Sequence, residues 1–164
     1  MTLIIDSRET STFANLVESK AMSLNVPIEK KWIEIGDYVI GDVCFEAKST
    51  TDFIGSILSK RLWTQLDNMD RCFKNNIVII YGSLEDGLQN SMHYGKSTMT
   101  PVRRIQFLTN KFYGGMSRIL IDSDVKPIWI ASENAAANLV ASVAKMQPVD
   151  RPPIQPHLFK RVTT

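Results

Sequence analysis

The sequence predicts an α/β domain in which helices pack on a central sheet. Two continuous apolar runs, residues 2–5 and 77–81, suit buried strands. Segments with helical spacing of apolar residues follow each of these runs. Between them, Gly41-Asp42 separates two short apolar runs, which predicts a tight hairpin turn. Strands that alternate with helices imply a layered α/β sandwich.

Length and composition describe one ordinary globular domain. The chain has 164 residues, of which 44% are hydrophobic and 22% charged. Its net charge is only +2, so a surface that binds nucleic acid would have to be local. Cys44 and Cys72 lack metal-binding spacing and do not form a disulfide framework, which favours a reducing, intracellular setting. No apolar run approaches the roughly 20 residues of a membrane helix, so we expect a soluble chain without a visible export signal.

The first half of the chain predicts a strand, a helix and a meander. Thr2–Ile5 is a strand that ends at Asp6, and residues 10–12 offer N-caps for a helix that extends to Asn25. Residues 28–35 alternate as a half-exposed strand does, and the hairpin around residues 41–42 follows. From Thr51 the spacing becomes helical, with a kink expected near Gly55 or Ser59. The apolar stripe of this helix contains Ile54, Leu58, Leu62, Leu66, Met69 and Phe73.

The second half predicts a strand, a long loop, a helix and a final strand–helix pair. After strand 77–81, residues 83–98 form a polar loop that is long enough to be functional. Thr100 and Pro101 open a helix that should stop by Gly114-Gly115. Residues 116–124 are compatible with a strand or with a helix, and their spacing favours a helix. Residues 126–131 form the last strand, and Ser132 caps the last helix.

Charged residues gather around the predicted hairpin. Because side chains alternate along a strand, Glu46 and Lys48 share one face while Ala47 points to the other. The hairpin turn returns Asp37 to the same neighbourhood. Two carboxylates and an ammonium group in one small volume favour a bound cation, and oxygen ligands suit Mg²⁺ or Mn²⁺. This arrangement predicts metal-dependent hydrolysis of phosphodiester bonds.

The same residues resemble a known family. An Asp followed by Glu-x-Lys resembles the restriction-endonuclease-like nucleases, and the wider pattern resembles the XPF-type structure-specific endonucleases over roughly residues 2–146. The motifs that carry the resemblance are Asp6-x-Arg8-Glu9, Gly36-Asp37-Tyr38 and Glu46-x-Lys48-x-x-x-Asp52. The resemblance implies a three-layer sandwich with a central mixed sheet flanked by helices. It also implies a Mg²⁺- or Mn²⁺-dependent endonuclease that acts on flaps, forks and junctions in DNA repair or recombination.

The resemblance assigns roles to seven residues. Asp37, Glu46 and Asp6 are the expected metal ligands. Lys48 would orient or deprotonate the attacking water, and Arg8 would clamp a phosphate. Asp52 begins a helix, so capping explains it as well as catalysis does. The candidate catalytic residues are Asp6, Arg8, Glu9, Asp37, Glu46, Lys48 and Asp52.

Cations outside this cluster are candidates for binding DNA. Arg61 and Gln65 are four residues apart on one helix face, and they are equally well explained as its solvated side. The helix after Pro101 carries three more cations that could reach the phosphate backbone. The candidate DNA-binding residues are Arg8, Arg61, Gln65, Arg103, Arg104 and Lys111.

Two alternatives to the branched-DNA nuclease stay open. The first is a non-catalytic, DNA-binding or scaffolding subunit of the same family, in which Arg usually occupies the position of Ala47. Such subunits typically lose the metal carboxylates, whereas this chain keeps them. Another enzyme of the restriction-endonuclease-like class would share the site but should lack the Asp6-x-Arg8-Glu9 motif.

The proline-rich tail, residues 147–164, is expected to be extended and to follow a nuclease domain of residues 1–146. No helix-hairpin-helix motif, which usually follows this domain in the family, is visible. The chain is therefore either an isolated catalytic domain or a protein that lacks the motif. The apolar region 116–146 predicts a homodimer or heterodimer interface. Gln155, Leu158 and Phe159 faintly resemble a sliding-clamp docking peptide, but the second aromatic residue is missing.

Overall fold

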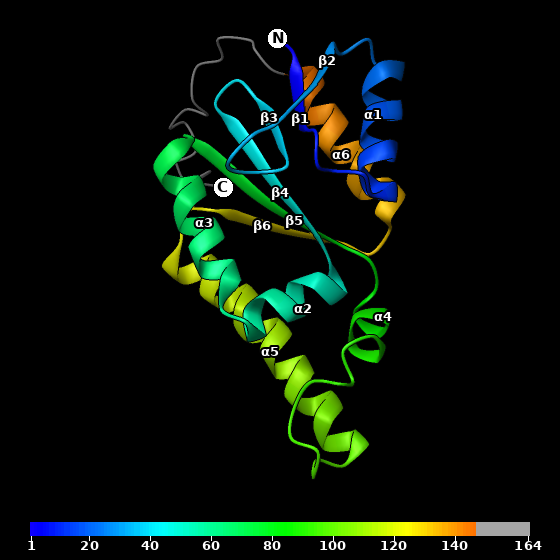
Figure 1. Ribbon diagram of the computed structural model, residues 1–164, viewed down its shortest axis with the longest axis vertical. Coiled ribbons are helices and arrows are strands. Elements are labelled where there is room, and N and C mark those ends of the chain that lie inside the picture. Colours follow the sequence, from blue (N-terminus) through cyan, green and yellow to red (C-terminus); the bar gives the residue numbers. More distant parts are fainter. Residues whose placement is uncertain (147–164) are drawn as a thin grey trace, which may run out of the picture.

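The computed structural model describes residues 1–146 as a mixed sheet of six strands covered by helices on both faces (Figure 1). The strand order is β2-β1-β3-β4-β5-β6. Strands β1–β2, β4–β5 and β5–β6 pair in parallel, whereas β1–β3 and β3–β4 pair antiparallel. The strands are β1 (Leu3–Asp6), β2 (Ile28–Lys31), β3 (Tyr38–Ile40), β4 (Val43–Ser49), β5 (Asn75–Tyr81) and β6 (Lys126–Ile130).

The helices form the two outer layers. Helices α1 and α6 cover one face of the sheet, and α2, α3 and α5 cover the other (Figure 1). The helices are α1 (Thr12–Ser23), α2 (Thr50–Leu58), α3 (Arg61–Cys72), α4 (Leu84–Gln89), α5 (Pro101–Asp122) and α6 (Glu133–Met146). The predicted three-layer α/β sandwich with a mixed central sheet is confirmed.

Each face of the sheet has its own aromatic core. Under α1 and α6, the ring of Phe13 stacks on Tyr81 with a centroid separation of 4.4 Å. Under α2 and α5, Phe53 and Phe112 meet edge to face at 5.4 Å. Burial of such rings supplies much of the hydrophobic stabilisation of the fold.

The predicted helix starts agree with the structure. The Ser11 hydroxyl accepts a hydrogen bond from the N–H of Ala14, and the Thr100 hydroxyl accepts one from the N–H of Arg103. Ser132 caps α6 through the N–H of Ala135. These hydroxyls satisfy N–H groups that would otherwise have no partner in the first helical turn.

The prediction that a helix stops at Gly114-Gly115 is wrong, because α5 runs through both glycines to Asp122. Gly115 is the point where α5 crosses α2: an added Cβ would lie 2.3 Å from Cδ1 of Ile57. The glycine therefore permits close helix packing here and does not act as a stop signal. Residues 116–122 are helical, as their spacing predicted.

Three further boundaries differ from the sequence predictions or refine them. The helix predicted from Thr51 is divided at Ser59-Lys60, where Lys60 has a φ of 64°, so the expected kink falls at the second of its two predicted positions. The strand predicted for residues 28–35 ends at Lys31. The predicted loop of residues 83–98 contains the short helix α4, which the Ser83 hydroxyl caps through the N–H of Asp86.

None of the helices within residues 1–146 has both the length and the apolarity that a bilayer span requires. The predicted extended tail, and the docking peptide expected at Gln155, Leu158 and Phe159, lie outside the described residues.

Candidate active site

Three neighbouring strands place three carboxylates side by side. The register pairs Ile5 with Tyr38 and Tyr38 with Phe45, so Asp6, Asp37 and Glu46 follow together one residue further along. The N–H of Asp6 donates to the carbonyl of Asp37 (2.9 Å), and the N–H of Asp37 donates to the carbonyl of Phe45 (2.8 Å). The backbone thus fixes the spacing of the three residues.

The sheet pleat aims these side chains at the α2–α3–α5 layer. Val39 and Cys44 belong to the core on that face, and residues two positions away along a strand share a face. Asp37, Glu46 and Lys48 therefore point to this side. Ala47 packs on the opposite side against the α1–α6 core, which agrees with the predicted alternation.

Asp37 is held by the backbone beside Ala47. Its Oδ2 accepts a hydrogen bond of 2.8 Å from the Ala47 N–H. Burial, followed by the negative charges of Glu46 and Glu9, raises the pKa of Asp37 well above its ordinary value. The Asp37 carboxylate therefore occupies a strongly negative position that a cation would relieve.

Glu46 and Lys48 form a buried ion pair. Lys48 Nζ lies 3.2 Å from Glu46 Oε1, and the two residues are only 6% and 8% exposed. Because removing two charges from water is costly, such a pair is weak evidence for stability and stronger evidence for a functional role.

The guanidinium group of Arg8 forms hydrogen bonds with the carboxylate of Asp6. Arg8 Nη2 donates to Asp6 Oδ2 (2.9 Å) and to the carbonyl of Ile33 (2.7 Å), and Nε donates to both carboxylate oxygens. Burial alone would raise the pKa of Asp6, but the hydrogen bonds and charge of Arg8 lower it below its ordinary value. The Arg8 guanidinium carbon also lies 5.2 Å from the ring centroid of Trp32.

Glu9 lies behind Asp37. Burial, assisted by the charges of Glu46 and Asp6, raises the pKa of Glu9 despite a hydrogen bond shared with Asp37. Four of the predicted acidic residues, Asp6, Glu9, Asp37 and Glu46, thus act electrostatically on one another, as the sequence motif predicted.

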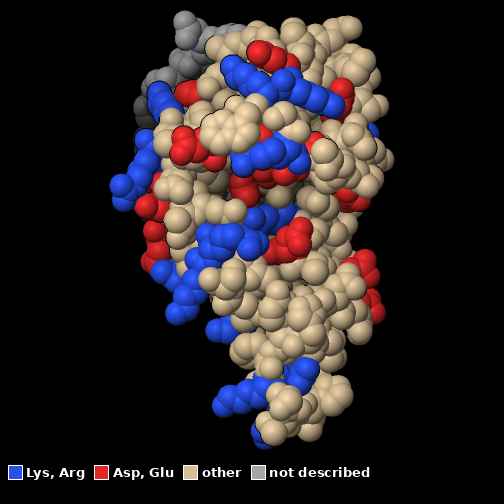
Figure 2. All heavy atoms as spheres, viewed as in Figure 1, with Lys and Arg blue, Asp and Glu red and all other residues tan. Residues whose placement is uncertain are grey.

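A cleft of about 250 Å³ opens over these residues. Acidic and basic side chains gather around a hollow on this face of the molecule (Figure 2). Gln65, a candidate DNA-binding residue, lines the cleft, and its buried Oε1 has no hydrogen-bond partner within the described part of the chain. The lining includes Asp6, Arg8, Glu34, Asp37, Glu46, Gln65 and Asn68.

The sequence did not point to two polar residues that line the cleft, Glu34 and Asn68. Asn68 stands one helical turn after Gln65 on α3, and this spacing was a usable signal. Glu34 lies in the segment that was predicted to be strand, and nothing in its spacing marks it.

Seven of the predicted site residues lie outside the lining of the cleft, and two of these, Glu9 and Lys48, lie next to residues that line it. Asp52 is exposed in the first turn of α2, and its N–H donates to the capping hydroxyl of Ser49. Arg61 is exposed at the start of α3. On α5, Arg104 donates to the carbonyls of Met92 and Lys96, which ties the preceding loop to the helix, while Arg103 and Lys111 are exposed.

The cleft residues suit a divalent cation bound together with substrate. Within residues 1–146, no group of three or more His, Cys, Asp or Glu side chains forms a ready-made cage for a metal. Mg²⁺ commonly uses one or two carboxylates and completes its shell with water and substrate phosphate. Asp37 and Glu46, which lie on adjacent strands and both border the cleft, match that requirement. Asp6 matches it less well, because Arg8 occupies both of its oxygens.

The model of the ERCC4 domain family matches residues 5–143. DNA repair endonuclease XPF of Dictyostelium discoideum is 39% identical over 79 residues, which cover 48% of this chain and 8% of that protein. The putative ATP-dependent RNA helicase MJ1505 of Methanocaldococcus jannaschii is 28% identical over 148 residues, covering 90% of this chain and 16% of that protein. The 3'-flap repair endonuclease Xpf of Saccharolobus solfataricus is 22% identical over 123 residues, covering 74% and 46% of the two chains.

Solved structures show the same fold. XPF from Aeropyrum pernix in complex with DNA superposes with a TM-score of 0.68 at 21% identity, covering 88% of this chain and 64% of that one. This likeness shows that the chain has the fold of the XPF structures, in agreement with the fold that the sequence predicted. The chain spans less than half the length of each of the three curated relatives named above. The match over residues 5–143 shows that the chain belongs to the ERCC4 domain family.

Proposed function

We propose that the chain is the catalytic domain of a Mg²⁺- or Mn²⁺-dependent endonuclease that hydrolyses phosphodiester bonds in branched DNA. The observation that carries the proposal is the alignment of Asp37 and Glu46 on adjacent strands, with Lys48 3.2 Å from Glu46 and both carboxylates bordering one cleft. Family membership and the names of two relatives, a DNA repair endonuclease and a 3'-flap repair endonuclease, support the same reaction and a place in DNA repair.

Asp37 and Glu46 would hold the cation, with Asp6 as a further ligand if Arg8 releases it. When bound, the ion would supply Lewis acidity to the scissile phosphate and lower the pKa of a coordinated water. The raised pKa of Asp37 supports this assignment, because its physical causes, burial and neighbouring negative charge, are those that a cation offsets.

Lys48 and Arg8 would act on the substrate directly. The Lys48 ammonium lies at the reacting side of Glu46, where it can orient the attacking water or stabilise charge on a phosphate oxygen. Arg8 is 57% exposed at its side chain, so its fork can turn from Asp6 towards a phosphate. Gln65 offers an unpaired acceptor at the wall of the cleft.

Cleavage of labelled DNA tests this function. Flap, fork, Holliday-junction and linear duplex substrates are incubated with the full chain and Mg²⁺, Mn²⁺ or EDTA. We expect cutting of branched DNA in either metal, no cutting in EDTA, and a loss of at least about 100-fold in Asp37→Asn. Glu85→Gln, which removes an exposed carboxylate on α4, is the matched control and should cut normally.

A folded chain that binds branched DNA and never cuts it would instead support a non-catalytic subunit. Cutting of linear duplex as fast as branched DNA would contradict the substrate class. Unchanged cutting in Asp37→Asn would contradict the assigned site.

We also propose that the chain dimerises through the end of α5 and strand β6. Leu120 and Ile121 are 62% and 82% exposed, and within residues 1–146 β6 is an edge strand of the sheet, with Trp129 37% exposed. Exposed apolar side chains next to an unpaired strand edge are typical of an association surface.

A further inference from the structure

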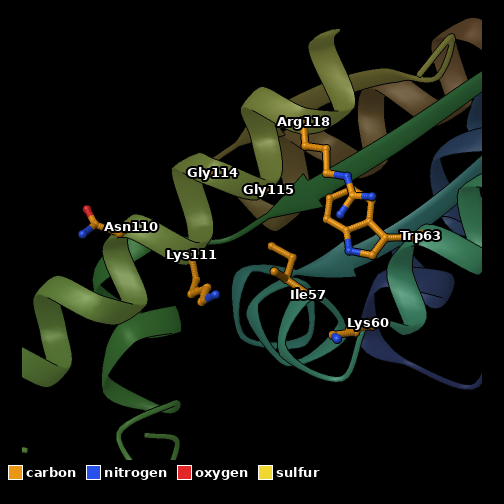
Figure 3. Close-up of a pocket in the computed structure, with 8 residues that line it drawn as sticks. All are labelled: Ile57, Lys60, Trp63, Asn110, Lys111, Gly114, Gly115 and Arg118. Atoms are coloured by element: carbon orange, nitrogen blue, oxygen red, sulfur yellow. The ribbon is translucent and has the colours of Figure 1, made fainter. Parts of the chain in front are cut away.

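A second, larger hollow lies between α3 and α5, away from the catalytic cleft. It measures about 560 Å³, and we call it the basic groove. Trp63 and Arg118 lie at one end, Lys111 projects from α5, and Lys60 lies at the start of α3 (Figure 3). The residues that line it are Ile57, Lys60, Trp63, Asn110, Lys111, Gly114, Gly115 and Arg118.

The lining of the basic groove is strongly one-sided in charge. It contains three cations and no acidic residue, although the whole chain carries a net charge of only +2. Within residues 1–146, no carboxylate forms an ion pair with Lys60, Lys111 or Arg118. A concave surface lined by one sign of charge concentrates the field that attracts a ligand of the opposite sign.

Other groups in the groove suit a phosphate strand. The guanidinium carbon of Arg118 lies 4.2 Å from the ring centroid of Trp63, so a cation–π interaction helps to position this cation. The indole nitrogen of Trp63 is turned to the groove side (Figure 3). Lys60, in a left-handed conformation, precedes the first turn of α3 and its side chain does not cap the helix.

The shape favours a single strand over a duplex. A duplex presents a broad convex surface, whereas a single strand can lay a base against an aromatic side chain and its phosphates against cations. Ile57 and the side-chain-free surface of Gly114 give the recess an apolar, uncrowded floor. An added Cβ at Gly114 would have no atom within 4 Å, so the space above this glycine is open.

Helix α3 connects the basic groove to the catalytic cleft. Its residues Gln65 and Asn68 line the cleft, whereas Trp63 lines the groove, so the helix forms the wall between them. A helix with side chains is about 10 Å wide, a distance that a few nucleotides of an extended strand cover. Arg61, exposed at the start of α3, lies in the chain between the groove residues Lys60 and Trp63.

We infer that the basic groove binds the single-stranded arm of the branched DNA while the scissile phosphate lies in the cleft. The inference rests on the proposed function, because it assigns a part of the same substrate. In this arrangement Lys60, Lys111 and Arg118 contact phosphates of the strand, and Trp63 stacks on a base.

Binding of a fluorescein-labelled oligothymidylate tests the inference. The full chain is titrated in EDTA, which prevents cutting, and anisotropy is followed over a range of salt concentrations. We expect Lys60→Ala/Lys111→Ala to bind about 10-fold more weakly at low salt. The slope of log K against log salt should become shallower by about 1.4, since each cation on a single strand contributes about 0.7. Lys20→Ala/Lys145→Ala, on the opposite face of the molecule, removes the same charge and should change neither quantity.

Tryptophan fluorescence supplies an independent readout. We expect oligothymidylate to quench the emission of the wild-type chain and of Trp129→Phe, and most of this quenching to be lost in Trp63→Phe. Unchanged affinity in the Lys60→Ala/Lys111→Ala variant, or undiminished quenching in Trp63→Phe, would overturn the inference. Competition by polyglutamate, added at the same concentration of negative charge as the oligonucleotide, would also overturn the inference. The groove would then bind acidic peptides.

The results of these experiments distinguish a failure of the groove inference from a failure of the proposed function. Asp37→Asn should bind the oligothymidylate like the wild type, since Asp37 does not line the groove. A chain that shows groove-dependent binding but never cuts DNA refutes the proposed function alone. A chain that cuts branched DNA, with wild-type strand affinity in the groove variants, refutes the inference alone.

Discussion

At the scale of single residues, the cleft contains buried charges that lower the stability of the fold and that the proposed function needs. Asp37 is buried beside Glu46 and Glu9, and the fold places these like charges together with Lys48 and Arg8 as neighbouring cations. The Ala47 N–H compensates Asp37 through one hydrogen bond. Functional sites commonly retain such unfavourable groups because their removal would abolish activity.

The substitution Asp37→Asn should stabilise the metal-free chain. Because the pKa of Asp37 is raised on folding, the folded chain binds this proton more tightly than the unfolded chain. The associated stability is fully present below the unfolded pKa of about 3.9 and is lost as pH rises through the folded pKa. Asn cannot lose a proton and keeps an acceptor for Ala47. Urea unfolding in EDTA should therefore show a gain on the order of 1 kcal/mol at pH 8 that shrinks towards pH 4. Equal or lower stability at pH 8 would contradict the charge repulsion described here.

The substitution Lys48→Met should have the opposite effect. It leaves the Glu46 carboxyl group buried beside Asp37 without its ammonium partner. We expect the free energy of unfolding to fall by about 3 kcal/mol at pH 7 and the loss to shrink in Glu46→Gln/Lys48→Met, where no charge remains. Equal losses in the single and double variants would show that the pair matters only through packing.

At the scale of elements, the sequence predicted what local chemistry determines and missed what packing determines. The hydroxyl caps of α1, α5 and α6 and the two-residue turn at Gly41-Asp42 follow from the residues themselves, and the structure has all of them. The continuation of α5 through Gly114-Gly115 depends on the approach of Ile57 from α2, which no local pattern records. Asn68 was missed although its spacing from Gln65 was a usable signal, because the strands that complete its surroundings in the cleft are distant in the sequence.

The two glycines of α5 should respond differently to alanine. Gly114→Ala adds a methyl group in open space within a helix and should raise the free energy of unfolding by about 0.5 to 1 kcal/mol. Gly115→Ala gains the same propensity but forces Ile57 to move, so it should be less stable than Gly114→Ala. Thermal and urea unfolding of both variants check this order. If Gly115→Ala is the more stable of the two, the close contact between α2 and α5 is wrong.

At the scale of the whole molecule, the mixed sheet gathers the site and leaves the two edges free. The central strands β1, β3 and β4 bring Asp6, Asp37 and Glu46 together from segments up to 40 positions apart. The motif spacing predicted this cluster, because the hairpin and the first strand are both local features. It did not predict the basic groove, which depends on α3 and α5 meeting side by side.

The proposed dimer surface predicts a change in oligomeric state. Leu120→Glu/Ile121→Glu places two charges on the exposed end of α5 and should convert a dimer into a monomer without loss of helix content. Light scattering after gel filtration measures the mass, and circular dichroism measures the helix content. Lys20→Glu/Lys145→Glu is a control on the α1–α6 side that should leave the mass unchanged. A wild-type chain that is monomeric at all concentrations tested would contradict this surface.

The proposed activity requires above all that Asp37 and Glu46 bind one divalent cation together. The most direct measurement is a Mn²⁺ titration in which electron paramagnetic resonance detects the free ion. The wild-type chain should remove Mn²⁺ from solution at one saturable site, Asp37→Asn and Glu46→Gln should each weaken that site at least about 10-fold, and Glu85→Gln should not. A wild-type chain that leaves Mn²⁺ free, or Asp37→Asn and Glu46→Gln variants that bind it as well as the wild type, would contradict the account.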